Sequence, residues 1–234
     1  MEDGVLLAPA PYAAPAGYYF PLTTRLGAVE IYKGPSMLPY GPNTLGGAIN
    51  LVTAPMPFDT QAELDLELGA DSFRRLHGRV GHGGEQWSYL LDFAHLETVG
   101  FKNIDGGGES GYARNDLLLK VRWDSDPAGN TLHRLNLKLG YGDETSDETY
   151  LGLTQEDYNE TPLRRYRGSY LDQMEWDRTQ VQLDYSVEFE SGLELTFTGY
   201  RHDFYRVWEK ANGFWGDNSL YVPGDDGYGT KSLS

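Results

Sequence analysis

Three arginines lie close together in the longest irregular stretch of the chain, at Arg164, Arg165 and Arg167. A guanidinium group can bind a carboxylate through two parallel hydrogen bonds, so this cluster could hold an anion that carries carboxylates. The same stretch also contains many acidic residues, among them Asp157 and Asp172. The alternative is therefore that the arginines form salt bridges within their own loop, and the sequence leaves both interpretations open.

Other residue types that support catalysis or metal binding are absent or badly spaced. The chain has no cysteine, which excludes disulfides, thiolate metal sites and cysteine nucleophiles. The acidic run Asp143–Asp147 lacks the ligand spacing and the glycine of a calcium-binding EF-hand loop, and the glycine-rich Asp105–Gly108 follows no βα pattern. The histidines are scattered singly, at His77, His82, His95, His133 and His202. We therefore expect no metal site, no cofactor and no enzymatic activity.

The composition restricts the class of protein. A formal net charge of -16 makes a nucleic-acid partner improbable, because binding to phosphates needs clustered Lys and Arg. The chain combines 17 tyrosines and 29 glycines with only 39% hydrophobic residues. This mixture fits either a soluble all-β domain or strands that face lipid on one side and water on the other.

Alternation of apolar and polar residues dominates the chain after Phe58. From Val181 to Phe189, for example, every second residue is apolar and the residues between are polar. Such alternation gives a strand one apolar and one polar face. Seven strands are predicted, at residues 61–70, 73–83, 86–98, 113–124, 131–142, 176–190 and 193–208. Their length and the density of charge on their polar faces favour a transmembrane β-barrel over a soluble sheet.

Two further features support the barrel. Short connections alternate with long ones at 99–112 and 142–175, as periplasmic turns alternate with outer loops in such barrels. Aromatic residues stand near the ends of the apolar stripes, where girdles meet the membrane interfaces. We assign Trp87, Trp123, Tyr141, Trp176 and Phe189 to these girdles.

Residues 1–57 differ from the rest in having clusters of proline and glycine and only short apolar runs. Ala28–Tyr32 and Ala48–Thr53 are predicted to be short strands. The uncharged stretch Gly4–Thr24 contains four prolines, which exclude a transmembrane helix. A small mixed domain is expected here.

Three ordered motifs within this region carry a family resemblance. They are Gly27–Ser36 (GAVEIYKGPS), then Tyr40-Gly41, then Gly46–Thr53 (GGAINLVT). Together they resemble the end of the plug domain of TonB-dependent outer-membrane receptors, with a lysine where that family more commonly has arginine. The structural residues of the motif are Lys33, Gly34, Pro35, Tyr40, Gly41, Gly46, Gly47 and Asn50.

The resemblance implies a mainly all-β fold with two parts. Residues 1–57 would be the C-terminal part of the plug, and 58–234 the N-terminal portion of a transmembrane barrel, so the chain is expected to be a fragment. Stretches near the start of the chain and at Asp147–Thr154 and Pro162–Tyr166 resemble the ferric-dicitrate-type receptors. The resemblance also places Tyr12, Tyr18 and Tyr19 near the top of the plug, where they would either contact the ligand or pack against the barrel wall.

Function and partners follow from the same resemblance. The chain would belong to a receptor in the outer membrane of a Gram-negative bacterium that imports a scarce ligand, such as ferric citrate or a siderophore. Ferric iron would enter only as part of that ligand. Energy would come from the TonB-ExbB-ExbD complex, through a TonB box that this chain lacks. The alternatives are a passive outer-membrane pore and a soluble β-sheet module that binds a ligand.

Overall fold

A computed structural model describes residues 1–7, 19–34, 46–126 and 128–211 of the chain. The first two strands, β1 (Leu26–Tyr32) and β2 (Ala48–Thr53), pair as an antiparallel ladder at the positions predicted for short strands. A 3-10 turn at Thr23–Arg25 leads into β1. The segment at Glu2 forms a bridge to Leu51, so the start of the chain lies beside β2.

A second, larger sheet contains seven antiparallel strands, as the sequence predicted. Neighbouring strands in the sheet follow one another along the chain, apart from the short strands β6 and β9, which lie in loops and pair with each other. The strands are β3 (Gln61–Leu68), β4 (Arg74–Gly83), β5 (Trp87–Thr98), β7 (Tyr112–Asp124), β8 (Thr131–Ser146), β10 (Gln173–Phe189) and β11 (Glu194–Glu209). Within the described ranges, β3 and β11 have one neighbour each and form the edges of the sheet.

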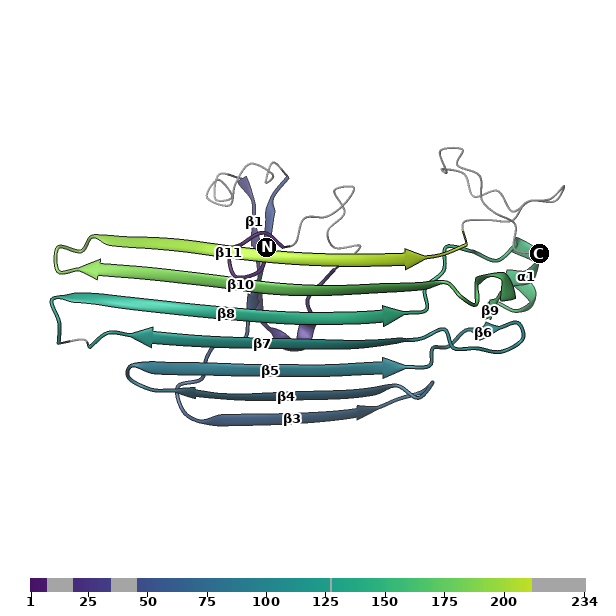
Figure 1. Ribbon diagram of the computed structural model, residues 1–234, viewed down its shortest axis with the longest axis horizontal. Helices are drawn as coiled ribbons and strands as arrows, with labels where there is room; N and C mark the ends of the chain where they lie inside the picture. The colour runs from purple at the N-terminus through teal and green to yellow at the C-terminus, as the bar shows by residue number, and fades with distance from the viewer. Residues whose placement is uncertain (8–18, 35–45, 127, 212–234) are drawn as a thin grey trace.

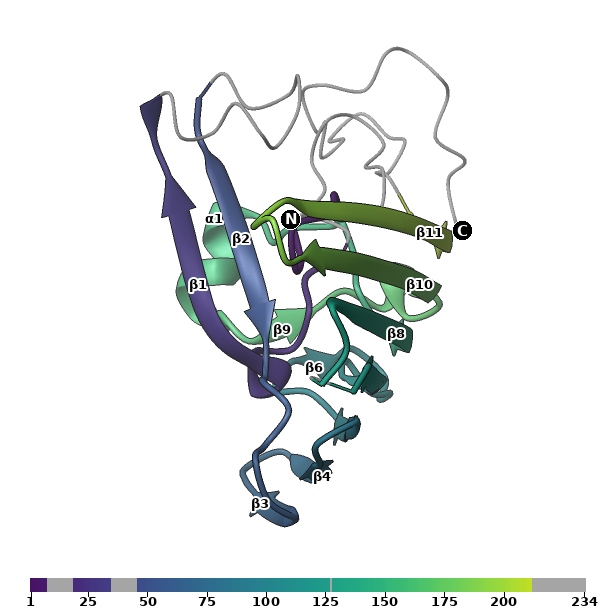
Figure 2. The same cartoon turned by 90° about the vertical axis from the view of Figure 1, so that its left-hand side faces the viewer.

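The large sheet is a curved wall, and the β1–β2 ladder stands on its concave side (Figure 2). The strands of the ladder run across the strands of the wall rather than along them (Figure 1). The short turns β4–β5, β7–β8 and β10–β11 lie at one end of the wall, and the long connections β5–β7 and β8–β10 lie at the other, together with the short β3–β4 connection (Figure 1). This arrangement matches the predicted alternation of short and long connections.

Polarity across the wall is the reverse of that in a soluble protein. On β10, the side chains of Arg178, Gln180 and Gln182 are at most 2% exposed and point toward the β1–β2 side. On the opposite face of the same strand, Val181 and Leu183 are 46% and 37% exposed. A soluble sheet buries its apolar face, whereas a membrane barrel turns that face to lipid.

The predicted aromatic girdle needs one correction. Trp87, Tyr141 and Phe189 are exposed on the apolar outer face, but Trp176 is only 4% exposed and lies on the inner face. Side chains alternate between the two faces of a strand, so Trp176 points to the same face as Arg178 and to the opposite face from Val181. Assigning Trp176 to a lipid-facing girdle was therefore wrong.

The strands β8 and β10 are longer than predicted at the end where the long loops gather. The structure extends β8 to Ser146 and begins β10 at Gln173, because Met174 to Asp177 pair with Ser146 to Asp143. The sequence analysis did not predict these strand ends, because it followed the alternation of apolar residues and the ends are mainly polar. The ladder there continues beyond the apolar band.

The two long loops between strands are connected by a small parallel sheet. In the first loop, β6 (Asn103–Ile104) pairs with β9 (Arg164–Arg165) in the second. The second loop also contains α1 (Gln155–Glu160), whose first turn is capped by the hydroxyl of Thr154 accepting from the amide of Asp157. No helix in the described residues is long and apolar enough to cross a membrane.

The connection from β2 to β3 packs tightly against the inner side of β4. A Cβ atom added at Gly81 would lie 2.7 Å from Pro57 Cδ, and one added at Gly83 would lie 2.2 Å from the Pro57 carbonyl oxygen. Only glycine allows this approach of two backbones. The glycines of β4 therefore fix where the plug region joins the wall.

Candidate functional site

Polar side chains of the wall hold the first segments of the chain through hydrogen bonds to backbone as well as side chains. Arg79 donates to the carbonyl of Thr24 over 2.6 Å, and Arg114 donates to the carbonyl of Phe20 over 2.6 Å. Lys120 Nζ donates to Thr53 Oγ1 and to the carbonyl of Ala54, over 2.9 and 3.0 Å. The inward polar face is therefore a docking surface for the described parts of residues 1–57, which are 1–7, 19–34 and 46–57.

A buried ion network lies at the centre of this contact. Arg25, which is 1% exposed, contacts Glu2 over 2.6 Å and Asp116 of β7 over 2.7 Å. Lys138 of β8 contacts the other oxygen of Glu2 over 2.5 Å and contacts Asp3 over 2.6 Å. The network thus joins the start of the chain, the entrance to β1 and two strands of the wall.

Electrostatics within the network favour its ionised form. Burial alone would raise the pKa of Glu2, but the positive charges of Arg25 and Lys138 outweigh that effect and lower the pKa to about 2. Burial would likewise lower the pKa of Arg25, yet the neighbouring Glu2 raises it above its ordinary value. Glu2 and Arg25 are therefore both charged at neutral pH.

Tyr19 contacts the wall on the side of the long loops. Its hydroxyl accepts a hydrogen bond of 2.6 Å from Arg178, whose guanidinium carbon lies 4.2 Å from the centre of the Tyr19 ring. Trp176 meets the same ring edge to face at 5.3 Å, and Arg114 lies 5.0 Å from the Trp176 ring. In the described structure Tyr19 thus packs against the wall, and a role in ligand binding stays a prediction.

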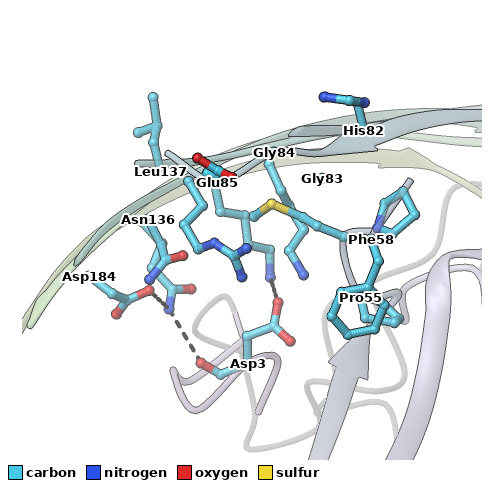
Figure 3. Close-up of a pocket in the computed structure, with 16 residues that line it drawn as sticks. Asp3, Pro55, Phe58, His82, Gly83, Gly84, Glu85, Asn136, Leu137 and Asp184 are labelled. Carbon is cyan, nitrogen blue, oxygen red and sulfur yellow. Dashed lines mark hydrogen bonds and ion pairs between the residues drawn. The ribbon is translucent and has the colours of Figure 1, made fainter. Parts of the chain in front are cut away.

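A cavity of about 890 Å³ separates the end of the plug region from the wall on the side of the short turns (Figure 3). Pro55 and Phe58 line one side, and Asn136, Lys138 and Gln182 line the other. Most of the wall side chains that line it are polar or charged, and donors outnumber carboxylates on the wall strands β7 and β8. Such a cavity suits a hydrated polar ligand better than an apolar one.

The predicted arginine cluster is divided among different partners. Arg164 contacts Asp105 of the other long loop over 2.9 Å and Asp157 of its own loop over 2.7 Å. Arg165 is 4% exposed and donates to the side chain of Ser169 and to the carbonyl of Asp147. The Arg164 side chain thus joins the two long loops and that of Arg165 holds its own loop, and the ligand role proposed for them stays untested.

Arg167 differs from the other two arginines. It forms no ion pair within the described residues, and its guanidinium lies 5.1 Å from the ring centre of Tyr170, which is 50% exposed. Arg164, by contrast, has a charged partner, because the hydrogen bond from Tyr166 and the pairing with Arg164 lower the pKa of Asp157. Among the three arginines, Arg167 is the best placed to meet a ligand from outside.

The described residues of the plug motif form the β1–β2 ladder and the turns that flank it. Gly34 and Gly47 have φ of +67° and +132°, which other residues adopt only with strain. Asn50 is buried, accepts from the amide of Gly4 and donates to Glu30. Lys33 and Gly46 flank these strands. The remaining predicted residues, Tyr12, Tyr18, Pro35, Tyr40 and Gly41, lie outside the described residues.

The sequence interpretation missed the ion network entirely. Glu2, Arg25, Asp116 and Lys138 are distant in the chain and fit no motif. The only available signal was that Asp116 and Lys138 lie on the polar faces of predicted strands. Among the described residues no group of three or more His, Cys, Asp or Glu could hold a metal ion.

Comparison with known proteins gives a consistent assignment. No family model matches the chain. A vitamin B12 transporter, BtuB, of Photobacterium profundum is 31% identical over 226 residues, which cover 83% of this chain and 37% of the relative. The ferric-catecholate import receptor Fiu of E. coli K12 has a similar structure, with a TM-score of 0.61 at 16% identity over 77% of this chain and 29% of that one. The siderophore receptor PiuA of Acinetobacter baumannii gives 0.56 at 13% identity, over 77% and 26%.

These relatives, the inverted polarity of the wall and the β1–β2 ladder on its concave side agree with the motifs at residues 27–53. The chain belongs to the TonB-dependent receptors of the outer membrane of Gram-negative bacteria. It spans about a third of the length of the curated relative that it matches. The short turns therefore face the periplasm, and the long loops face the exterior.

Proposed function

We propose that the chain forms plug and wall of a receptor that binds a scarce ligand outside the cell and imports it. The observation that carries the proposal is the wall of β3–β11, which turns apolar side chains outward and holds plug segments on a polar inner face. An open passive pore would have no plug segment anchored by buried ion pairs such as Arg25–Asp116. A soluble module would not expose its apolar face.

The proposed ligand is a ferric chelate such as ferric citrate or a siderophore. The named activities of Fiu and PiuA support this class, and the similarity to BtuB supports a corrinoid as a second candidate. Arg164, Arg165 and Arg167 on the outer loop, with Tyr12, Tyr18 and Tyr19 of the plug, are the proposed contacts. Energy would come from TonB, ExbB and ExbD.

Uptake by whole cells tests the function. Cells that express the full-length receptor are given one of three labelled ligands, which are iron-55 citrate, an iron-55 catecholate and cobalt-57 cobalamin. The cells should accumulate one of them. Accumulation should disappear in a strain that lacks TonB. Uptake of none of these ligands above the level of an empty vector would overturn the proposed ligand classes, and equal uptake without TonB would overturn active import.

Replacement of the three arginines by glutamine tests the proposed contacts. Affinity of the full-length receptor for its ligand should fall, and Arg167→Gln alone should cause most of the loss because Arg164 and Arg165 already hold loop residues. Arg201→Gln is the matched control, since Arg201 is 78% exposed on β11 and pairs with Asp203. Unchanged affinity in the triple variant would exclude these residues from the ligand site.

A further inference from the structure

Two lysines of the wall face each other across a pair of strands. Lys120 of β7 and Lys138 of β8 are directly opposite in the antiparallel register, and both point inward to residues of the plug region. Like charges in directly opposite positions destabilise an antiparallel sheet. A negative group must therefore offset them, and its position shows what this part of the wall can bind.

The plug region provides this negative charge unevenly. Lys138, which is 5% exposed, contacts the carboxylates of Glu2 and Asp3. Lys120 donates to two neutral oxygens, those of the Thr53 hydroxyl and the Ala54 carbonyl, and forms no ion pair within the described residues. Glu2 is shared between Lys138 and Arg25, and the Asp3 carboxylate is shared between Lys138 and the amide and hydroxyl of Thr53.

Asp3 is also the more exposed of the two acids that contact Lys138. It is 19% exposed, whereas Glu2 is fully buried, and it borders the cavity of about 890 Å³ (Figure 3). The backbone there is a tight turn, with φ of +46° at Asp3 and +83° at Gly4. Displacement of this one turn would open the lysines to the cavity.

Further hydrogen-bonding groups for an anion are already in place around the lysines. The Gln182 amide nitrogen donates to the Asp3 carbonyl over 3.3 Å, and its Oε1 is buried without a hydrogen-bond partner. Asn136 lines the same side of the cavity. A carboxylate that replaced Asp3 would therefore meet two ammonium groups, together with an amide nitrogen that also donates to the carboxylate of Asp184 over 3.0 Å.

We propose that Lys120, Lys138 and Gln182 form an anion-binding site on the wall, and that the Asp3 turn covers it in this structure, with the Asp3 carboxylate on Lys138 and the Asp3 carbonyl on Gln182. A small anion with several carboxylates binds there when Asp3 withdraws. The plug and the passing ligand thus compete for one set of donors. The place of the site on the import route rests on the proposed function, whereas the binding of an anion does not.

Binding of citrate to the purified full-length receptor in detergent tests the site. Citrate affinity is measured by calorimetry at constant ionic strength for the wild type and for Asp3→Asn, which keeps the shape of the turn but removes its charge. We expect Asp3→Asn to bind citrate about tenfold more tightly or better, because charge-assisted hydrogen bonds to the lysines become available. Asp203→Asn, which removes an exposed carboxylate from β11, should leave the affinity unchanged.

Second-site variants identify the donors. In the Asp3→Asn background, Lys138→Met and Lys120→Met should each abolish the gain, while Lys138→Arg should keep it and Lys102→Met, in the first long loop, should not affect it. If Asp3→Asn does not fold, Asp3→Ser allows the same comparison. Equal citrate affinity in wild type and in the Asp3 variant, or a gain that survives Lys138→Met, would overturn the proposal.

The same measurements separate this site from the proposed function. A receptor that imports no ferric chelate, but whose Asp3 variant gains citrate binding through the two lysines, would refute the import of chelates and leave the site standing. A receptor that imports its ligand without any such gain would refute the site alone.

Discussion

Removal of Arg25 tests how strongly the wall holds the plug region. Arg25→Met deletes the contacts of 2.6 Å to Glu2 and 2.7 Å to Asp116 without leaving a large void. Glu2 keeps its contact of 2.5 Å with Lys138, but Asp116 has no second ion pair in the part of the chain that the structure describes, and its Oδ2 already has no hydrogen-bond partner there. The buried charge of Asp116 is therefore the main cost.

The size of the effect follows from this asymmetry. Removing one partner of a buried ion pair costs about 3–5 kcal/mol, and we take the lower end because Glu2 remains paired. A loss of about 3 kcal/mol corresponds to about a 100-fold increase in the population of the opened plug. Hydrogen exchange of the β1 amides in the full-length receptor measures that population, because exchange reports local opening.

Two comparisons make the prediction specific. The double variant Arg25→Met/Asp116→Met should regain most of the lost protection, because replacing all the charges of a pair by apolar groups is often nearly neutral. Arg201→Met removes an exposed ion pair of β11 and should leave the β1 amides unaffected. Protection within threefold of wild type in Arg25→Met, or no recovery in the double variant, would refute the assignment of the network as the main anchor.

Three further predictions concern pH, the linker and the lipid face. The pKa of Glu2 is about 2 in the folded chain against an ordinary value of 4.5. The stabilising effect of the Glu2 charge is therefore complete above about pH 4.5 and is lost as the pH falls toward 2. Hydrogen exchange of the β2 amides should accelerate over that range, and Glu2→Gln should remove this pH dependence. Gly83→Ala should destabilise the packing of the linker on β4 by about 1–3 kcal/mol, because its Cβ would lie 2.2 Å from the Pro57 carbonyl oxygen. Limited proteolysis near residue 57 should then become faster. Gly78→Ala, whose Cβ would meet only Leu64 at 3.8 Å, should leave the rate of proteolysis unchanged. Leu139→Arg on the lipid face should lower the free energy of unfolding by about 2–4 kcal/mol and reduce the folded fraction measured by heat-modifiable gel mobility. Asn136→Arg on the inner face of the same strand should leave that fraction unchanged. Equal effects of the two substitutions would contradict the assignment of the faces.

The architecture was accessible from the sequence because strand periodicity is a local property. The alternation at Val181–Phe189 predicts both the strand and its two faces, and the lengths of the connections predict which ends carry loops. The short strands β1 and β2 were predicted for a similar reason, since Gly and Pro residues bound them and Gly34 and Gly47 adopt backbone angles that few residues adopt, whereas their pairing came only from the structure. The seven strands thus follow from short-range patterns.

The loops show where local reasoning ends. Sequence spacing brought Arg164, Arg165 and Arg167 together, but the structure sends Arg164 to Asp105, 59 positions away, and buries Arg165 among carbonyls. Only the pairing of β6 with β9 brings these partners together. The alternative of salt bridges within the loop had one correct partner, Asp157, and could not foresee the other.

The sequence by itself determined the strands, their polarity and the family resemblance, because each depends on residues close together in the chain. Only the tertiary structure decided which inward side chains meet the plug region. Lys138 finds Asp3 across 135 positions, and Gln182 finds it across 179, because the curved wall brings β8 and β10 around the start of the chain. No local pattern encodes such contacts, since they depend on register, on the twist of seven strands and on the path of the linker past Gly81 and Gly83.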